Sequence, residues 1–287
     1  MPFLRWRHDS LRTSVLTRAF ATLLICVCIL YGVPLAASPV PVRYKVGLLH
    51  GFLVLSTLDG TPLAEGDLTQ VPHGDRITSH LTFHFKDGSQ QEETTVFSQR
   101  DYFRLISYHL VQKGPAFPHP TDISIASTGQ VTVQYTDNDG KQKVSNEHLT
   151  LPPDLANGFV PTLLENIRPD APQIEVPMVV ATPKPRLVKL VITAQGTEPF
   201  SLAGSGREAT HYVVKVDVGG VAGAVAPIIG KQPPDTHIWI LGGEAPVLVK
   251  SETLSYPGGP IWRIEQVAPV WPRSAASELK DGSGKKY

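Results

Sequence analysis

The chain has 287 residues, of which 26 are basic and 26 acidic, and 41% are hydrophobic. This length suits one large domain or two small ones, and the composition is that of a protein with a buried core. The balanced charge argues against nucleic acid as a partner, because phosphates attract clustered Lys and Arg side chains.

The first 37 residues have the organisation of a secretory signal peptide. Arginines at positions 5, 7, 12 and 18 precede an apolar run from Ala19 to Tyr31, and Leu35-Ala36-Ala37 follows as a cleavage site. The alternative is an uncleaved membrane anchor, but a spanning helix needs about 20 apolar residues and Pro34 shortens the usable helix. We therefore expect residues 1–37 to be a signal peptide. The arginines hold the N-terminus in the cytoplasm, so the mature chain should be periplasmic or secreted.

Cysteine usage limits the chemistry of the mature chain. The two cysteines, Cys26 and Cys28, both lie in the apolar run. After cleavage near Ala37 the chain would hold no disulfide, no thiolate zinc site and no catalytic thiol. A hydrophobic core must then supply the stability of the protein.

Regular alternation of apolar and polar residues predicts many β-strands. In the run from Arg76 to Phe85, the side chains of Ile77, Leu81 and Phe83 point to one face and the polar residues between them point to the other. The runs with this pattern are residues 44–55, 76–85, 94–97, 102–111, 131–135, 211–218, 237–241, 247–256 and 261–267.

Turn dipeptides separate several of these runs. They are Asp59-Gly60, Asp87-Gly88, Asp139-Gly140 and Gly258-Gly259, and tight hairpins need residues of this kind. We therefore predict an all-β fold: a large curved antiparallel sheet or partly open barrel with one short helical insertion. It should form a single domain over residues 38–272, followed by a disordered tail over residues 273–287.

The segment that interrupts the strand pattern predicts the helical insertion. After Leu151-Pro152-Pro153-Asp154, apolar residues recur three or four apart from Leu155 to Ile167. This spacing indicates a helix with Asp154 as its N-cap, which Gly158 and Pro161 should make short or kinked. The helix would cover an open end or face of the sheet, or act as a lid over an apolar cavity.

No residue pattern in the chain fixes a chemistry. His80 and His84 share a strand face but lie about 13 Å apart, so they cannot bind one metal ion. Glu92 and Glu93 are adjacent in a strand and point to opposite faces, so they cannot act as a carboxylate pair. We predict no cofactor, no metal and no catalytic residue. An enzyme would need a site assembled from residues distant in sequence.

The C-terminal part of the chain resembles a known family. Trp239-Ile240-Leu241, the run Ala245 to Glu252 and the run Tyr256 to Arg263 resemble the closing hairpin of an exported bacterial domain family of unknown function. In that family a tryptophan strand is followed by a strand with Pro-Val and a basic residue, and then by a glycine turn. The strand from Arg207 to Asp217 also fits. The resemblance implies an antiparallel β fold in the cell envelope and does not indicate an activity.

The concave face of such a sheet suggests the function. A curved sheet can fill its interior with its own side chains or leave room for an apolar ligand. Our leading hypothesis is an exported envelope protein that binds a lipid or another hydrophobic molecule. The alternatives are a structural or protein-interaction module with a filled core and an envelope protein as partner, and a hydrolase. The candidate ligand-lining residues are Phe83, Phe85, Tyr102, Phe103, Tyr135, Trp239 and Trp262.

Overall fold

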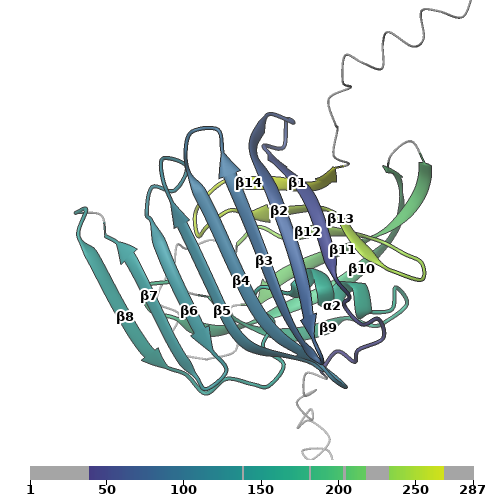
Figure 1. Ribbon diagram of the computed structural model, residues 1–287, viewed down its shortest axis with the longest axis horizontal. Helices are drawn as coiled ribbons and strands as arrows, with labels where there is room; N and C mark the ends of the chain where they lie inside the picture. The colour runs from purple at the N-terminus through teal and green to yellow at the C-terminus, as the bar shows by residue number, and fades with distance from the viewer. Residues whose placement is uncertain (1–38, 138, 181, 203–204, 218–232, 268–287) are drawn as a thin grey trace, which may run out of the picture. The chain divides into compact units, whose positions relative to one another are not determined.

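The computed structural model describes residues 39–137, 139–180, 182–202, 205–217 and 233–267. Within these ranges, fourteen strands form one antiparallel sheet that does not close on itself. Its order is β8-β7-β6-β5-β4-β3-β2-β1-β14-β13-β12-β11-β10-β9 (Figure 1). Almost every strand therefore pairs with its neighbours in sequence, while β1 pairs with β14, and β8 and β9 form the two edges.

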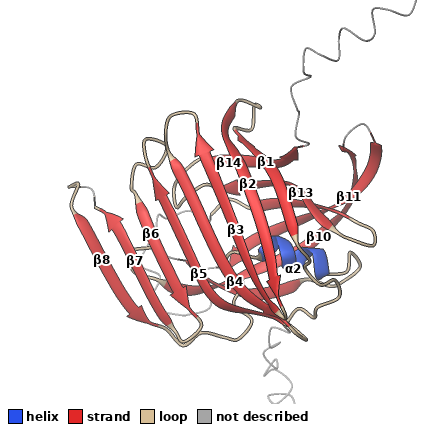
Figure 2. Cartoon of the chain, viewed as in Figure 1, coloured by secondary structure: helices blue, strands red, loops and turns tan. Residues whose placement is uncertain are grey.

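The first half of the chain supplies β1 (Leu49–Ser56), β2 (Pro62–His73), β3 (Arg76–Phe85), β4 (Gln90–Gln99), β5 (Phe103–Lys113), β6 (Thr121–Ala126), β7 (Gln130–Thr136) and β8 (Gln142–His148). The second half supplies β9 (Ile174–Val180), β10 (Arg186–Leu202), β11 (Ser205–Asp217), β12 (Thr236–Leu241), β13 (Val247–Leu254) and β14 (Ile261–Val267). A short helix, α2 (Val160–Asn166), connects the two halves (Figure 2).

The structure confirms the predicted fold class, an antiparallel sheet with a short helical insertion. The strand expected at residues 76–85 has the bounds of β3, and each predicted hairpin turn contains one glycine with positive φ: Gly60, Gly88, Gly140 and Gly258. The alternation of apolar and polar residues did not predict β2, β6, β8, β9 and β10. Strand β8 is polar except for Val144, and β2 contains Pro62, Gly66 and Pro72, which all weaken a strand signal. Pairing with neighbouring strands overrides these local preferences.

One face of the sheet carries the main core, and we call it the inner face. The main core contains buried side chains from β3 to β7, from β9 to β12 and from α2. Strands β7 and β9 are far apart in the strand order, yet both contribute. The sheet must therefore bend so that its two halves pack around a common interior. A second buried cluster on the inner face, near the β1–β14 pair, centres on Leu55, Phe83, Phe85 and Trp262.

The predicted helix is present but shorter than its apolar spacing suggests. It begins after Phe159, which makes no side-chain cap, so the expected N-cap at Asp154 is wrong. Gly158 has φ of +79° and packs against Thr95 and Tyr108, which prevents the helix from starting earlier. Pro161 lies in the first turn, where its missing N–H costs nothing.

Two buried asparagines attach the connecting segment to β9 and to the stretch of chain before β1. Asn157 accepts a hydrogen bond from the Val179 backbone N–H of β9 and donates one to the Val179 carbonyl, both at 2.9 Å. Asn166, at the end of α2, accepts the backbone N–H groups of Arg43 and Tyr44 at 2.8 and 2.7 Å. The segment thus covers the inner face and also bonds backbone groups of β9 and of the stretch before β1.

Several sequence predictions concern residues outside the described ranges. The expected signal peptide (1–37) and the tail (273–287) both fall there, so the predicted division of the chain stays a prediction. No helix in the described part of the chain is long and apolar enough to span a membrane.

The packing of β2 against Phe83 yields a test of the inner face. Gly66 lies directly opposite Phe83, and a Cβ at this position would overlap the Phe83 ring. We expect Gly66→Ala to lower the free energy of unfolding by about 1–3 kcal/mol through overpacking. Gly51→Ala on β1 is the matched control, since its Cβ would meet nothing closer than 3.8 Å. Urea unfolding measures both, and equal stabilities would contradict the packing described.

Candidate functional site

A half-buried row of side chains crosses the inner face between the two buried clusters. Leu68 of β2 lies opposite Leu81 of β3, Leu81 lies opposite Glu93 of β4, and Glu93 lies opposite Leu110 of β5. Directly opposed residues of an antiparallel sheet share a face, and Leu110 is in turn opposite Ile123 of the main core. We call Leu68, Leu81, Glu93 and Leu110 the inner row. All four keep part of their surface accessible.

Glu93 is the polar member of the inner row. Burial raises its pKa to about 7, although the Tyr108 hydroxyl, which donates to Glu93 Oε2 at 3.2 Å, acts in the opposite direction. Burial disfavours the charged form of a carboxyl group. Glu93 is therefore largely protonated below neutral pH and can then donate a hydrogen bond from an apolar surface.

Polar side chains lie on both sides of Glu93 along the inner face. Gln91, two residues before it, accepts a hydrogen bond at 2.8 Å from Gln112 Nε2, which also donates to the Ser255 carbonyl at 3.0 Å. Thr95, two residues after it, is buried opposite Tyr108. The site thus combines three leucine side chains with a few fixed polar groups, the usual composition of a small-molecule site.

Three of the predicted ligand-lining aromatics pack against one another instead of lining free space. Phe85 and Trp262 have ring centroids 5.3 Å apart, and Phe117 lies 5.3 Å from Phe85 and 5.9 Å from Trp262. Phe83 is fully buried in the same cluster. Phe83, Phe85 and Trp262 therefore form a filled core beside the inner row.

The other predicted aromatics are dispersed. Phe103 is buried in the main core, where its ring centroid lies 6.1 Å from that of Phe97. Tyr135 is half-buried at the border of the same core. Tyr102 is 42% exposed and forms an isolated bridge with Pro41. The structure therefore does not bring the seven residues together into one lining.

Trp239 lies on the opposite face of the sheet. Its neighbours Ile238 and Ile240 belong to the main core, whereas Trp239 packs with Ala209 and Val249. Its indole N–H donates to Glu198 at 2.8 Å, the Lys250 ammonium lies 3.5 Å from its ring centroid, and the His211 ring stacks on it at 4.4 Å.

His211, the stacking partner of Trp239, contacts two further titratable groups. Its ring nitrogens lie 3.0 Å from a Glu198 oxygen and 2.9 Å from His237 Nδ1. Burial lowers the pKa of His211, against the attraction of Glu198. His211, His237 and Glu198 therefore contact one another beside the Trp239 ring.

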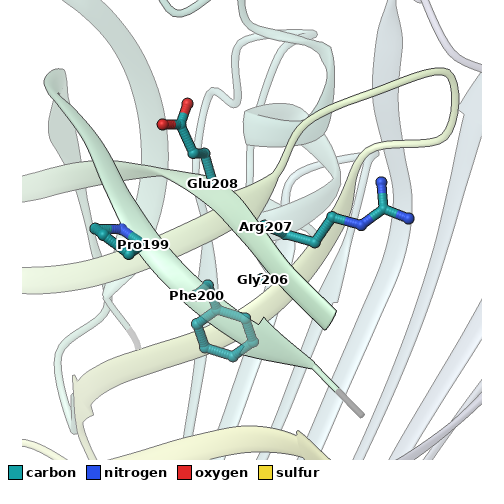
Figure 3. Close-up of a pocket in the computed structure, with 5 residues that line it drawn as sticks. All are labelled: Pro199, Phe200, Gly206, Arg207 and Glu208. Atoms are coloured by element: carbon teal, nitrogen blue, oxygen red, sulfur yellow. The ribbon is translucent and has the colours of Figure 1, made fainter. Parts of the chain in front are cut away.

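A surface hollow of about 380 Å³ lies on the β10–β11 hairpin. Pro199, Phe200, Gly206, Arg207 and Glu208 line it (Figure 3). Figure 3 shows the charged ends of Arg207 and Glu208 pointing away from each other and from the Phe200 ring. Because its polar groups do not converge, the hollow is a weaker candidate than the inner row.

In the described ranges no group of three His, Cys, Asp or Glu side chains is placed to hold a metal ion. His80 instead contacts the hydroxyls of Thr94 and Thr82, at 2.9 and 3.1 Å.

Comparison with known proteins gives one weak likeness. No family model and no curated protein matches the chain. Among solved structures, it is similar to the β-barrel-like protein of domain of unknown function DUF1849 from Brucella abortus, with a TM-score of 0.42 and 9% identity over 83% of this chain and 100% of that one. That neighbour is a bacterial β-rich protein. A likeness at this level does not transfer properties, and the family resemblance of the C-terminal hairpin stays a prediction.

The raised pKa of Glu93 predicts a pH-dependent stability. Between pH 4.5, its ordinary pKa, and about pH 7, the folded state binds more protons than the unfolded state, so stability should fall as the pH rises through this window. Glu165 of α2, whose pKa burial also raises to about 7, contributes in the same direction. Glu93→Gln should reduce the slope of the free energy of unfolding against pH. Tyr108→Phe should move the Glu93 titration to higher pH, because it removes the hydrogen bond that lowers the Glu93 pKa.

Urea unfolding at several pH values, with carboxyl NMR of Glu93, measures both effects. Glu92→Gln, on the exposed opposite face of β4, controls for the loss of one negative charge. A Glu93→Gln variant with the wild-type slope would contradict the burial of this carboxyl group.

Proposed function

We propose that the protein binds an amphiphilic small molecule, such as a fatty acid or fatty alcohol, along the inner row. The observation that carries this proposal is the alignment of Leu68, Leu81 and Leu110 with a raised-pKa carboxyl group on one half-buried strip. Half-buried leucines on the inner face of a bent sheet leave part of their apolar surface in contact with water. A ligand that covers them gains about 25 cal/mol for each Å² of apolar surface removed from water.

The geometry of the row indicates the ligand's shape. Neighbouring strands lie about 4.8 Å apart, so the row spans about 14 Å from β2 to β5. An extended acyl chain is long and narrow enough to follow it. The polar group of the ligand would lie at Glu93, which donates a hydrogen bond while it is protonated, and the apolar part would cover Leu81 and Leu68.

The site of action is part of the proposal. The signal-peptide pattern of residues 1–37 supports a role outside the cytoplasm, where a carrier of apolar molecules would meet membrane lipids. N-terminal sequencing of the mature protein should find Ser38 or a residue near it. Mature protein that begins at Met1 and stays embedded in the membrane would contradict export.

The structural alternative also has an observation in its favour. The mutual packing of Phe85, Phe117 and Trp262 is what a filled core requires. A protein that used this core only for stability would not take up ligand at the inner row. Uptake of a fluorescent fatty acid separates the two functions.

Leu81→Asn tests binding at the inner row. The full-length, delipidated protein is titrated with a fluorescent fatty acid at pH 6, where Glu93 is protonated. We expect saturable binding by the wild type and a loss of about tenfold or more in affinity for Leu81→Asn, because a leucine contact contributes about 1.5 kcal/mol or more. Leu58→Asn, in the exposed β1–β2 turn, is the matched control. A wild type that takes up no fatty acid would refute the proposal.

Phe83→Ser tests whether Phe83 is a core residue or a ligand contact. Phe83 has no exposed surface and packs among Leu53, Leu55 and Trp262. Its truncation should lower the free energy of unfolding by about 3–5 kcal/mol, as for other large core side chains. Thermal unfolding measures the loss. A variant of wild-type stability that has lost fatty-acid uptake would instead identify Phe83 as a ligand contact.

A further inference from the structure

The two edges of the sheet are finished in different ways. Along β9, the connecting segment occupies the outer edge: the Ala156 N–H donates to the Pro177 carbonyl at 2.9 Å, and Asn157 bonds both backbone groups of Val179. Pro177 itself lacks an N–H. An unpaired strand edge is a template for another strand, and a covering loop or a proline removes it. The β9 edge is therefore blocked.

The β8 edge has no comparable cover among the described residues. All of its residues except Ser145 are exposed, and its sequence, Gln142-Lys143-Val144-Ser145-Asn146-Glu147-His148, contains no proline. Val144 is 58% exposed. The strand contributes no side chain to the buried clusters, so core packing does not explain its presence.

The sequence of β8 is complementary to itself. In an antiparallel pair of two copies with a two-fold axis at Ser145, each Lys143 lies opposite Glu147 of the second copy, and Gln142 lies opposite His148. Val144 lies opposite Asn146, with Val144 of the second copy diagonally beside it. This register uses every residue of the strand and pairs both charges twice. An interface related by a two-fold axis requires such self-complementarity.

We propose that the β8 edge is a homodimer interface, in which two copies of this chain pair their β8 strands around Ser145 and continue the sheet from one molecule into the next. The partner is a second copy because the charges match in that arrangement. Lys143 Nζ lies 3.7 Å from Asp137 within its own chain, but both side chains are partly exposed, and such a pair holds the lysine only weakly.

The interface is small. One pair of seven-residue strands buries less than the roughly 1,200 Å² of a standard stable complex. We expect a weak dimer with a Kd of about 10 μM to 1 mM. The dimer leaves the inner row untouched, so its existence does not depend on ligand binding.

Charge exchange across the interface tests this register. Sedimentation equilibrium of the full chain between about 10 μM and 1 mM should show a reversible dimer for the wild type. Lys143→Glu places Glu opposite Glu twice and should raise Kd about tenfold or more. The double variant Lys143→Glu with Glu147→Lys restores both pairs and should recover dimerisation. Lys86→Glu, in the exposed β3–β4 turn, is the matched control and should dimerise as the wild type does.

Three results of this experiment would contradict the proposed dimer. A wild type that stays monomeric over the whole range overturns the proposal. So does a dimer that Lys143→Glu leaves unchanged, because the copies would then associate through another surface. Failure of the double variant to dimerise, with a circular dichroism spectrum like that of the wild type, refutes the pairing centred on Ser145.

Discussion

The whole arrangement depends on covering the inner face of a very long antiparallel sheet. Alternation places apolar side chains from β3 to β7 and from β9 to β12 on one face, and water must be excluded from them. The sheet achieves this by bending around its own connecting segment. Leu155, Phe159, Leu163 and Leu164 fill the space between the two halves, and Phe159 stacks on Phe97 with ring centroids 4.9 Å apart.

The connecting segment brings polar groups into this interior, and each finds a partner. Asn166 and Asn157 bond backbone groups of the chain they cover, Tyr212 donates to the Ile167 carbonyl at 3.3 Å, and Glu165 accepts the Leu248 N–H at 3.1 Å. No buried side-chain polar atom among the described residues lacks a partner. These bonds fix where the segment lies. The inner row, which lies between the two buried clusters, is left half-covered.

Much of the fold follows from local patterns, while the site does not. The alternation in residues 76–85 and the Asp-Gly turns predicted β3 and several hairpins because a strand with one buried face repeats every two residues. Polar β8 and proline-containing β9 have no such signal, since their neighbours decide their pairing. The helix was placed correctly, but the N-cap was not, because contact of Gly158 with Thr95 and Tyr108 is a tertiary constraint.

The candidate site was sought among aromatics because they offer the largest apolar area. Because burial of a large apolar area is strongly favourable, Phe83, Phe85 and Trp262 are instead buried in a core cluster. Sequence does place Leu81 on the inner face and separates Glu93 from Glu92. It cannot show that Leu68, Leu81, Glu93 and Leu110 form one row, because that alignment depends on the registers of three strand pairs, one of them involving the unpredicted β2.

The central claim is that the inner row is a binding surface, and leucine methyl NMR tests it most directly. Full-length protein with labelled leucine methyl groups is titrated with dodecan-1-ol below pH 7. The account predicts saturable shifts at Leu68, Leu81 and Leu110, with little change at buried Leu55 and Leu164. Absence of saturable shifts at the three row leucines, or shifts confined to exposed leucines such as Leu48 and Leu187, would contradict it.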